Sequence, residues 1–258
     1  MFFKTIDFSS YSSIKVGQAT QVLMIEANDT IPLDRYLIGG ANNVLISPNP
    51  PALMMLSKDF ATISKDSHML TIGAAMPTGR IVSYAKKHNI GGFEFCSKLP
   101  GTLGGMLAMN AGVKAYEIFN ILHSIKIKGK WIPKEEVEHG YRYAKLAGIA
   151  THARFEIHHG FNQTLLDDLL NLRSNQPSQA SAGSAFKNPP DDYAGRLIEA
   201  AGLKGVRKGA MQWSDLHANF LINWGGGTFE DAKFLIDLAK AEVLKHFSIH
   251  LQEEIKIL

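Results

Sequence analysis

Apolar and polar positions follow two different patterns along the 258-residue chain. Before residue 160 the apolar segments are short and are separated by glycine-rich turns, which predicts β-strands with few helices. Residues 77–88 are the exception, because their late lysines and the following Asn89 and Gly91 predict a helix that ends there. The strands are expected at residues 36–38, 44–46, 69–72 and 125–128.

After residue 160 the pattern becomes helical. Thr164 and Asp167 form a capping-box pattern that predicts a helix to about Arg173, followed by a polar linker over residues 174–183. A second helix is expected at about residues 192–201, before Gly202. A further capping box at residues 228–231 precedes a longer helix. Its apolar stripe comprises Ala232, Leu235, Ile236, Ala239, Val243 and Phe247.

This change of pattern predicts two domains, residues 1–160 and residues 161–258, the first with lobes at about 1–57 and 58–160. A hydrophobic content of 45% with 20% charged residues is typical of a globular protein and excludes bulk disorder. The formal charge of +3 argues against a dedicated nucleic-acid binder and suits anionic substrates.

Cysteine usage and the N-terminal segment indicate a cytoplasmic protein without a membrane span. Cys96 is the single cysteine, so no intrachain disulfide can form, and we expect it to be buried as a small hydrophobe. The first residues lack the apolar stretch of a signal peptide, and no apolar run approaches the roughly 18 residues that span a bilayer. The ten histidines lack metal-ligand spacing, so we predict no metal site.

Two glycine-rich loops are candidates for phosphate binding. They are Gly39-Gly40-Ala41-Asn42-Asn43 and Pro100-Gly101-Thr102-Leu103-Gly104-Gly105. Backbone amides without covering side chains can form a concave anion site, and a helical turn expected at residues 106–110 would add its dipole. Neither loop matches the GxGxxG fingerprint or a P-loop. Each alone is more often a plain turn, whereas together they suggest a non-Rossmann site for a cofactor that carries a pyrophosphate.

The segments around these loops resemble the UDP-N-acetylenolpyruvoylglucosamine reductases. The first loop lies in a segment similar to that family's flavin loop, and residues 94–112 resemble its second flavin-binding segment. Gly183-Ser184-Ala185-Phe186-Lys187-Asn188-Pro189 matches the family's most specific motif. Further similarity lies, in collinear order, at residues 141–142, 194–205, 217–220 and 251–255.

The resemblance implies an α+β protein with an FAD-binding fold of the vanillyl-alcohol oxidase type and a C-terminal α/β substrate-binding domain. It also implies FAD and NADPH as cofactors in a two-step reduction of UDP-N-acetylglucosamine enolpyruvate to UDP-N-acetylmuramate, in peptidoglycan precursor synthesis. The partners implied are these small molecules, with no nucleic acid and no membrane, and the expected state is a monomer.

The resemblance also assigns three catalytic residues. Ser184 is the implied proton donor, since a positioned hydroxyl can protonate a strongly basic enolate, and Ser178 and Ser181 are its neighbouring alternatives. Arg142 is implied to stabilise charge on the substrate carboxylate. Glu254, with Glu253 as the alternative, is implied to contact the substrate carboxyl or assist proton transfer.

The remaining implied site residues contact the cofactor or the substrate. The flavin-binding residues are Gly39, Gly40, Ala41, Asn42, Asn43, Val44, Leu45, Pro100, Gly101, Thr102, Gly104, Gly105, Asn110, Ala111 and Gly112. The substrate-binding residues are Tyr141, Lys187, Asn188 and Asn219.

The chain also departs from the family's usual pattern. Gln18 follows Gly17 where two glycines are usual, Asn42 stands where serine is usual, and Ala144 replaces a common serine. Asn175 replaces a lysine, which leaves Arg173 or Lys187 as the cation for the substrate diphosphate.

The compact length matches the shorter class of the family, which lacks a tyrosine-bearing insertion. Two other functions remain open at this point. One is another FAD-dependent oxidoreductase of the same fold, and the other is a nucleotide-sugar or flavin-binding module without turnover.

Overall fold

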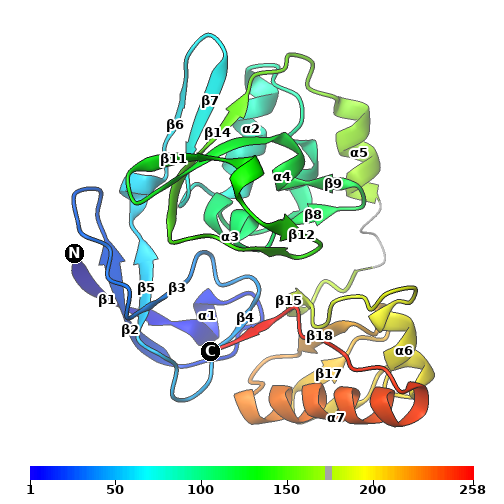
Figure 1. Cartoon of the computed structure of the whole chain (residues 1–258). Coiled ribbons are helices and arrows are strands. Elements are labelled where there is room, and N and C mark those ends of the chain that lie inside the picture. Colours follow the sequence, from blue (N-terminus) through cyan, green and yellow to red (C-terminus); the bar gives the residue numbers. More distant parts are fainter. Residues whose placement is uncertain (172–175) are drawn as a thin grey trace. The chain divides into compact units, whose positions relative to one another are not determined.

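The computed structural model describes residues 1–171 and 176–258, which form two compact units (Figure 1). Unit 1 comprises Met1–Lys4, Val22–Gly40 and Ala52–Ser174, and unit 2 comprises Thr5–Gln21, Ala41–Pro51 and Asn175–Leu258. The strands β1 (Phe2–Asp7) and β2 (Ala19–Ile25) each run from one unit into the other. Arg173 and Asn175 lie outside the described residues. The domain boundary near residue 160 stays a prediction.

The largest sheet of unit 1 is antiparallel, in the order β11-β10-β14-β7-β6. Its strands are β6 (Ile63–Lys65), β7 (Met69–Gly73), β10 (Leu122–Ile127), β11 (Lys130–Pro133) and β14 (Ala150–Glu156). Ile125 and Ile127 are buried, and the residue between them points to the other face, which confirms the predicted alternation. Lys128 and Gly129 both have positive φ and make the two-residue turn into β11.

A second, partly parallel sheet has the order β1-β2-β5-β3. Within unit 1, β5 (Leu53–Leu56) pairs in parallel with both β2 and β3 (Tyr36–Leu37). The short elements of unit 1 are η1 (Lys58–Phe60), η2 (Glu94–Lys98), α3 (Leu103–Ala108), β8 (Gly112–Val113), β9 (Tyr116–Glu117), α4 (Ile118–Ile121), η3 (Lys134–Glu136), β12 (His139–Gly140) and β13 (Tyr143–Ala144).

Two longer helices belong to unit 1. The predicted helix α2 (Thr78–Lys87) is confirmed; it buries Ile81, Val82 and Ala85 on one face and ends before Asn89, whose φ is 52°. The helix α5 (Gln163–Asn171) begins two residues before Leu165, the first helical residue that a Thr164 cap predicts. The Asn162 side chain accepts the amide hydrogen bond of Leu165 at 2.9 Å and caps the helix, so the Thr164 capping box is wrong. Asparagine ranks above threonine as an N-cap, which favours Asn162 over Thr164.

Unit 2 is built on an antiparallel sheet in the order β15-β18-β17-β16. Its strands are β15 (Ala180–Ser184), β16 (Arg207–Lys208), β17 (Met211–Trp213) and β18 (Phe220–Asn223). The polar linker predicted over residues 174–183 is therefore wrong from Ala180 onward. These small residues have no apolar alternation of their own, and pairing with β18 makes them a strand. The other elements are α1 (Phe8–Tyr11), β4 (Val44–Leu45), α6 (Ala194–Ala200) and β19 (Lys256–Ile257).

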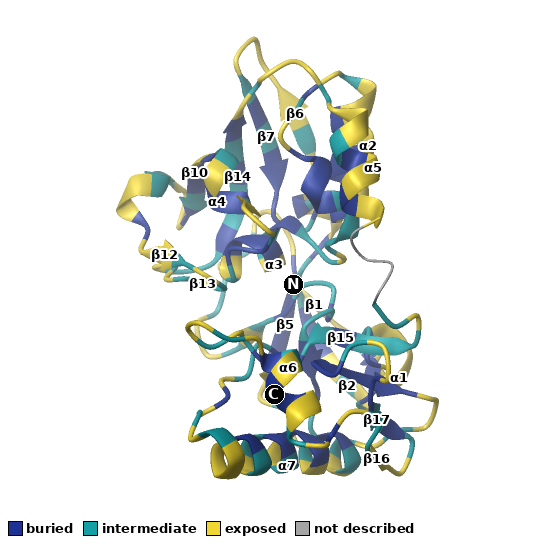
Figure 2. Cartoon of the chain, turned by 90° about the vertical axis from the view of Figure 1, so that its right-hand side faces the viewer, coloured by how far each residue is buried: buried dark blue, intermediate teal, exposed yellow. Residues whose placement is uncertain are grey.

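The helix α7 (Phe229–Phe247) packs against β16 and β17. Thr228 caps it by accepting a hydrogen bond from the amide of Asp231 at 3.1 Å, as the capping pattern predicted. Five of the six stripe residues are buried, Phe247 packs at the edge of the core, and the opposite face is exposed (Figure 2). No helix in the described part of the chain is long and apolar enough to cross a bilayer.

Each unit has its own hydrophobic core. In unit 1, α2 and α3 contribute Ile81 and Leu103 to a core shared with Phe93, Phe119 and Phe155. In unit 2, the core combines Leu235 and Ile236 of α7 with Trp213 and Phe186. Ile14 and Leu45 also belong to it, so two N-terminal segments complete the C-terminal core. Cys96 is buried in the first core, and burial raises the pKa of its thiol.

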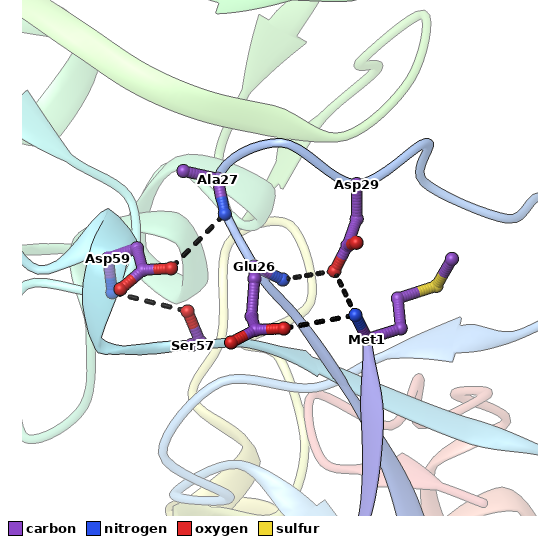
Figure 3. Close-up of polar contacts among 6 residues, drawn as sticks. All are labelled: Met1, Glu26, Ala27, Asp29, Ser57 and Asp59. Atoms are coloured by element: carbon purple, nitrogen blue, oxygen red, sulfur yellow. Dashed lines mark hydrogen bonds and ion pairs between the residues drawn. The ribbon is translucent and has the colours of Figure 1, made fainter.

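Charged groups at the start of unit 1 fix a turn that follows β2 (Figure 3). The Met1 ammonium group lies 3.0 Å from the Glu26 carboxylate and 2.7 Å from that of Asp29. Asp29 also accepts the amide hydrogen bond of Glu26, and Asp59 accepts that of Ala27. Hydrogen bonds from the ammonium and the backbone lower the pKa of Asp29. The carboxylates of Asp29 and Asp59 thus hold the backbone of this turn at Glu26 and Ala27.

Candidate active site

The two glycine-rich loops meet within unit 1 at Gly39 and Thr102. A Cβ atom on Gly39 would lie 2.6 Å from Thr102 Oγ1, so any larger residue there would force Thr102 to shift. Thr102 in turn caps α3, and the amides of Leu103 and Gly104 donate to the carbonyls of Met76 and Ala74. The second loop is therefore fixed by backbone bonds, and its helix begins at Leu103, three residues before the helical turn that the sequence predicted.

The chemistry of these loops fits a diphosphate-bearing group. Neither loop contains an acidic side chain, and the glycines at positions 39, 40 and 101 carry no side chain that would cover the backbone against phosphate oxygens. The amides of Gly104 and Gly105 are already bonded within the protein. The Ser97 hydroxyl, just before the second loop, is buried without a hydrogen-bond partner among the described residues. A buried hydroxyl without a partner is a group that a ligand can satisfy.

The second half of the first loop belongs to unit 2, where it binds the C-terminal segment. Ala41 has a φ of 51°, and Asn42 Nδ2 donates to Ser13 Oγ at 2.7 Å. Asn43 Nδ2 donates to the Glu254 carbonyl at 3.0 Å. The amide of Lys256 donates to the Asn43 carbonyl, so β19 pairs in parallel with the buried strand β4. This pairing docks the segment that carries Glu254.

Ser184 ends β15 at an irregular point of the sheet. Gly183 has a φ of 79°, and the register with β18 shifts between Ser181 and Ser184. A positive φ favours glycine, so the local backbone conformation explains the glycine at position 183 of the motif.

Asn219 holds the segment that follows Ser184. Its side-chain Oδ1 accepts from the Phe186 amide at 3.0 Å, and its Nδ2 donates to the Phe186 carbonyl at 2.8 Å. The amide of Ala185 donates to the Asn219 carbonyl. Asn219 is only 2% exposed, and both polar atoms of its side chain bond to the backbone of Phe186. Asn219 therefore fixes the backbone beside Ser184, a structural role that the sequence did not predict.

The two adjacent glutamates of the C-terminal segment have different partners. Lys240 Nζ on α7 donates to Glu253 at 2.6 Å. Burial raises the pKa of Glu253, but the hydrogen bond from Lys240, a backbone hydrogen bond and the charges of Lys240 and Lys233 together outweigh it, so the net pKa is lowered. The amide of Glu254 donates to the Ala185 carbonyl at 2.8 Å, next to Ser184. The Glu253 side chain thus binds Lys240 of α7, whereas the Glu254 backbone binds the segment that carries Ser184.

The predicted substrate contacts Lys187 and Asn188 lie on the same segment of unit 2. The Lys187 amide donates to the Gln252 carbonyl at 2.9 Å, which adds a further bond to the C-terminal segment. The Asn188 side-chain carbonyl accepts the Ala194 amide at 3.1 Å and holds the start of α6.

Arg142 belongs to unit 1, where Tyr141 and Arg142 form the two-residue loop between β12 and β13. The φ of Arg142 is 60°, at a loop position that normally takes glycine or asparagine. Its guanidinium lies over the Tyr141 ring at 5.0 Å. One nitrogen donates to the Gly112 carbonyl at 3.0 Å, and the other lies 3.9 Å from Glu117 Oε1.

Glu117 joins Arg142 to a predicted flavin-binding residue. Asn110 Nδ2 donates to Glu117 Oε2 at 2.7 Å, and the Asn110 side chain is buried. The sequence gave no sign of Glu117, because an isolated acid between two apolar residues has no motif. Among the described residues, no group of three or more His, Cys, Asp or Glu side chains could hold a metal ion.

The fold matches that of a reductase of known structure. The crystal structure of UDP-N-acetylenolpyruvylglucosamine reductase from Thermus caldophilus superposes with a TM-score of 0.86 and 26% identity, covering 100% of this chain and 99% of that chain. The predicted α+β fold class is confirmed by this match. The chain thus has the fold of a reductase.

Sequence comparisons identify the family. Residues 176–258 match the family described as UDP-N-acetylenolpyruvoylglucosamine reductase, C-terminal domain. The reductase of Helicobacter hepaticus is 46% identical over 257 residues, or 98% of each chain, and that of a Campylobacter jejuni strain is 47% identical over 259 residues, or 98% of this chain and 99% of the relative. The chain belongs to the UDP-N-acetylenolpyruvoylglucosamine reductase family and is an oxidoreductase.

Replacing Gly39 by alanine tests the contact between the two loops. The new Cβ would press on Thr102 Oγ1, so we expect Gly39→Ala to weaken flavin retention and Gly39→Ala/Thr102→Ala to restore part of it. The measurement is bound flavin per chain after gel filtration. Gly79→Ala, on α2 with nothing near its Cβ, is the control and should retain flavin fully. Unchanged retention in Gly39→Ala would show that the loops do not need this contact.

Asn219→Ala tests the bonds to Phe186. It leaves one buried amide and one buried carbonyl unpaired, which predicts a loss of about 2–4 kcal/mol in the free energy of unfolding. Urea unfolding measures this loss. Asn120→Ala, which removes an exposed side-chain bond, should cost less than about 0.5 kcal/mol. Equal stability of the two variants would contradict the prediction.

The Lys240–Glu253 pair predicts a pH dependence. Because the folded pKa of Glu253 is lowered, its stabilisation is present above the unfolded value of about 4.3 and is lost as pH falls through the lowered pKa. Glu253→Gln should therefore be less stable than the parent at pH 7, by at most about 1 kcal/mol in this partly exposed pair, with no difference at low pH.

Thermal unfolding from pH 2 to pH 7 measures this difference. Lys240→Met should reproduce the effect, and the double variant should add nothing to it. An additive double variant would show that the two side chains act separately.

Proposed function

We propose that the chain reduces the enolpyruvyl group of UDP-N-acetylenolpyruvoylglucosamine to give UDP-N-acetylmuramate, with FAD and NADPH, in peptidoglycan precursor synthesis. One observation carries the proposal most directly. Ala185, next to the proposed proton donor Ser184, accepts the backbone hydrogen bond of Glu254, and Glu254 is itself bonded to Asn43 of the first glycine-rich loop. Predicted proton-donor, acid and cofactor segments thus meet in one unit. The family's relatives across nearly the whole chain add support.

FAD would be held by the two glycine-rich loops. The backbone of Gly39, Gly40 and Gly101 suits its diphosphate because no side chain covers it, and Ser97 offers a buried hydroxyl. When bound, FAD supplies the two-electron chemistry that links NADPH to the enolpyruvyl double bond. The chain's own residues then have three tasks, which are to hold the substrate, to stabilise charge and to deliver a proton.

Arg142 is the proposed charge-stabilising residue. Two electrons and one proton added at the terminal vinyl carbon leave enolate charge on the adjacent carbon and on the substrate carboxylate. A guanidinium stays charged at any physiological pH and can bind a carboxylate with two parallel hydrogen bonds. Its positive φ fits a functional role, because strained backbone conformations cluster at functional sites.

Ser184 is the proposed proton donor. Its O–H bond breaks as a C–H bond forms at the enolate carbon, and the serine oxygen recovers a proton from solvent or a neighbouring acid. Glu254 is the proposed acid, because Glu253 is bound to Lys240 and Glu254 is joined to the Ser184 segment. Lys187 and Asn188 are the proposed contacts to anionic and amide groups of the substrate.

Anaerobic spectroscopy of the two half-reactions tests this function. NADPH should bleach the flavin absorbance of the purified protein, and the enolpyruvyl nucleotide sugar should restore it. Bleaching of the flavin by a sugar or alcohol without NADPH, followed by reoxidation with oxygen, would contradict the proposal. A protein that takes up no FAD would also contradict it.

In the same experiment, Ser184→Ala should be bleached by NADPH at the parent rate. Its reoxidation by substrate should be slower by about 10²–10⁴-fold, the usual contribution of general acid catalysis. Ser181→Ala, three residues earlier on β15, is the matched control and should reoxidise normally. Parent-like reoxidation of Ser184→Ala would remove Ser184 as the proton donor.

A further inference from the structure

Arg142 lies on a loop, so its own backbone does not fix the direction of its long side chain. The loop between β12 and β13 contains only Tyr141 and Arg142. An arginine side chain has several rotatable bonds, and ordering it has an entropic cost that neighbouring contacts must offset. Those contacts come from segments about 25–30 residues earlier in the chain, at Gly112 and Glu117.

Glu117 is placed to serve both Arg142 and the segment before it. Its Oε1 faces the guanidinium at 3.9 Å, while its Oε2 accepts the hydrogen bond of Asn110 at 2.7 Å. The carboxylate is 23% exposed and the guanidinium 19%, so the pair is largely shielded from solvent.

Asn110 anchors this carboxylate to the backbone. Its Nδ2 also donates to the Gly140 carbonyl at 3.1 Å, and its Oδ1 accepts the Phe119 amide at 3.2 Å. Asn110 is 1% exposed and has a φ of 44°. Gly140 immediately precedes the loop of Arg142, so the same amide group fixes both the carboxylate and the base of the loop.

We propose that Glu117 is a positioning residue that holds the Arg142 guanidinium for the substrate carboxylate. The inference rests on the proposed function. Glu117 supplies one fixed negative charge, and the Gly112 carbonyl supplies a second contact, so the guanidinium is held from two sides. Glu117 does not itself touch the reacting atoms.

Two half-reactions separate this role from a general structural one. The experiment uses the flavin-loaded protein under anaerobic stopped-flow conditions. Glu117→Gln keeps an acceptor for Asn110 but removes the charge that faces Arg142. We expect bleaching by NADPH within about twofold of the parent, and reoxidation by the enolpyruvyl substrate about tenfold slower, since a displacement of about 1 Å at a site can cost up to about a hundredfold.

A double-mutant cycle shows whether Glu117 acts through Arg142. Glu117→Gln/Arg142→Ala should reoxidise no more slowly than Arg142→Ala alone. Glu156→Gln, which removes an exposed carboxylate beside His158, is the control and should leave both half-reactions unchanged. Equal slowing of both half-reactions in Glu117→Gln, a parent-like reoxidation rate, or additive effects in the double variant would each overturn the proposal.

Chemical rescue gives a second test that does not depend on the glutamine variant. Glu117 lines a cavity of about 260 Å³ with Phe95, Tyr116 and Asn120, so a small carboxylate can reach the space left by Glu117→Ala. Formate should accelerate reoxidation of Glu117→Ala by severalfold and leave Glu156→Gln unaffected. If Glu117→Ala reoxidises slowly and formate does not accelerate it, the carboxylate is not what Arg142 requires, and the proposal fails.

These outcomes are distinct from failure of the proposed function. If the parent protein is not bleached by NADPH or not reoxidised by the enolpyruvyl sugar, the function itself is wrong. If the parent passes both steps and Glu117→Gln matches it in each, only the inference is wrong.

Discussion

Backbone hydrogen bonds to the C-terminal segment hold unit 2 together. The amides of Glu254 and Ile255 donate to the Ala185 carbonyl, that of Lys256 donates to Asn43, and that of Leu258 donates to Leu45. Three segments far apart in the sequence are therefore joined by main-chain groups, which do not depend on side-chain identity. The side chains of these segments are therefore not needed for the docking itself. Glu253 and Glu254 are adjacent, yet the Glu253 side chain binds Lys240 and Glu254 is the proposed acid of the site.

In unit 1, side chains rather than backbone groups hold the proposed site residues in place. Asn110 and Glu117 hold Arg142, and a threonine at position 102 both caps a helix and fills the space beside Gly39. Asn110 and Thr102 each bond to the local backbone and also contact a proposed site residue or its partner. Such double use explains why motifs of glycine, asparagine and threonine cluster here, since these residues tolerate positive φ or cap helices.

Elements with strong local signals were predictable from the sequence. The stripe of α7 and the alternation of β10 follow from helical and strand periods, and both were confirmed. The strand β15 was missed because small residues carry no period, and the Asn162 cap was missed because a threonine two residues later matched the pattern equally well. Glu117 and the engagement of Asn219 with Phe186 could not be predicted, because both depend on partners 25 to 33 residues away.

The backbone of Arg142 also bears on how the protein tolerates change. A non-glycine residue at positive φ costs of order 1 kcal/mol or more, so the backbone of the loop by itself favours glycine at position 142. Arginine is retained against that cost, and its guanidinium contacts with Gly112 and Glu117 offset part of it. Backbone strain and chemistry therefore favour different residues at the same position, and the loop is one place where the fold carries a local cost for the site.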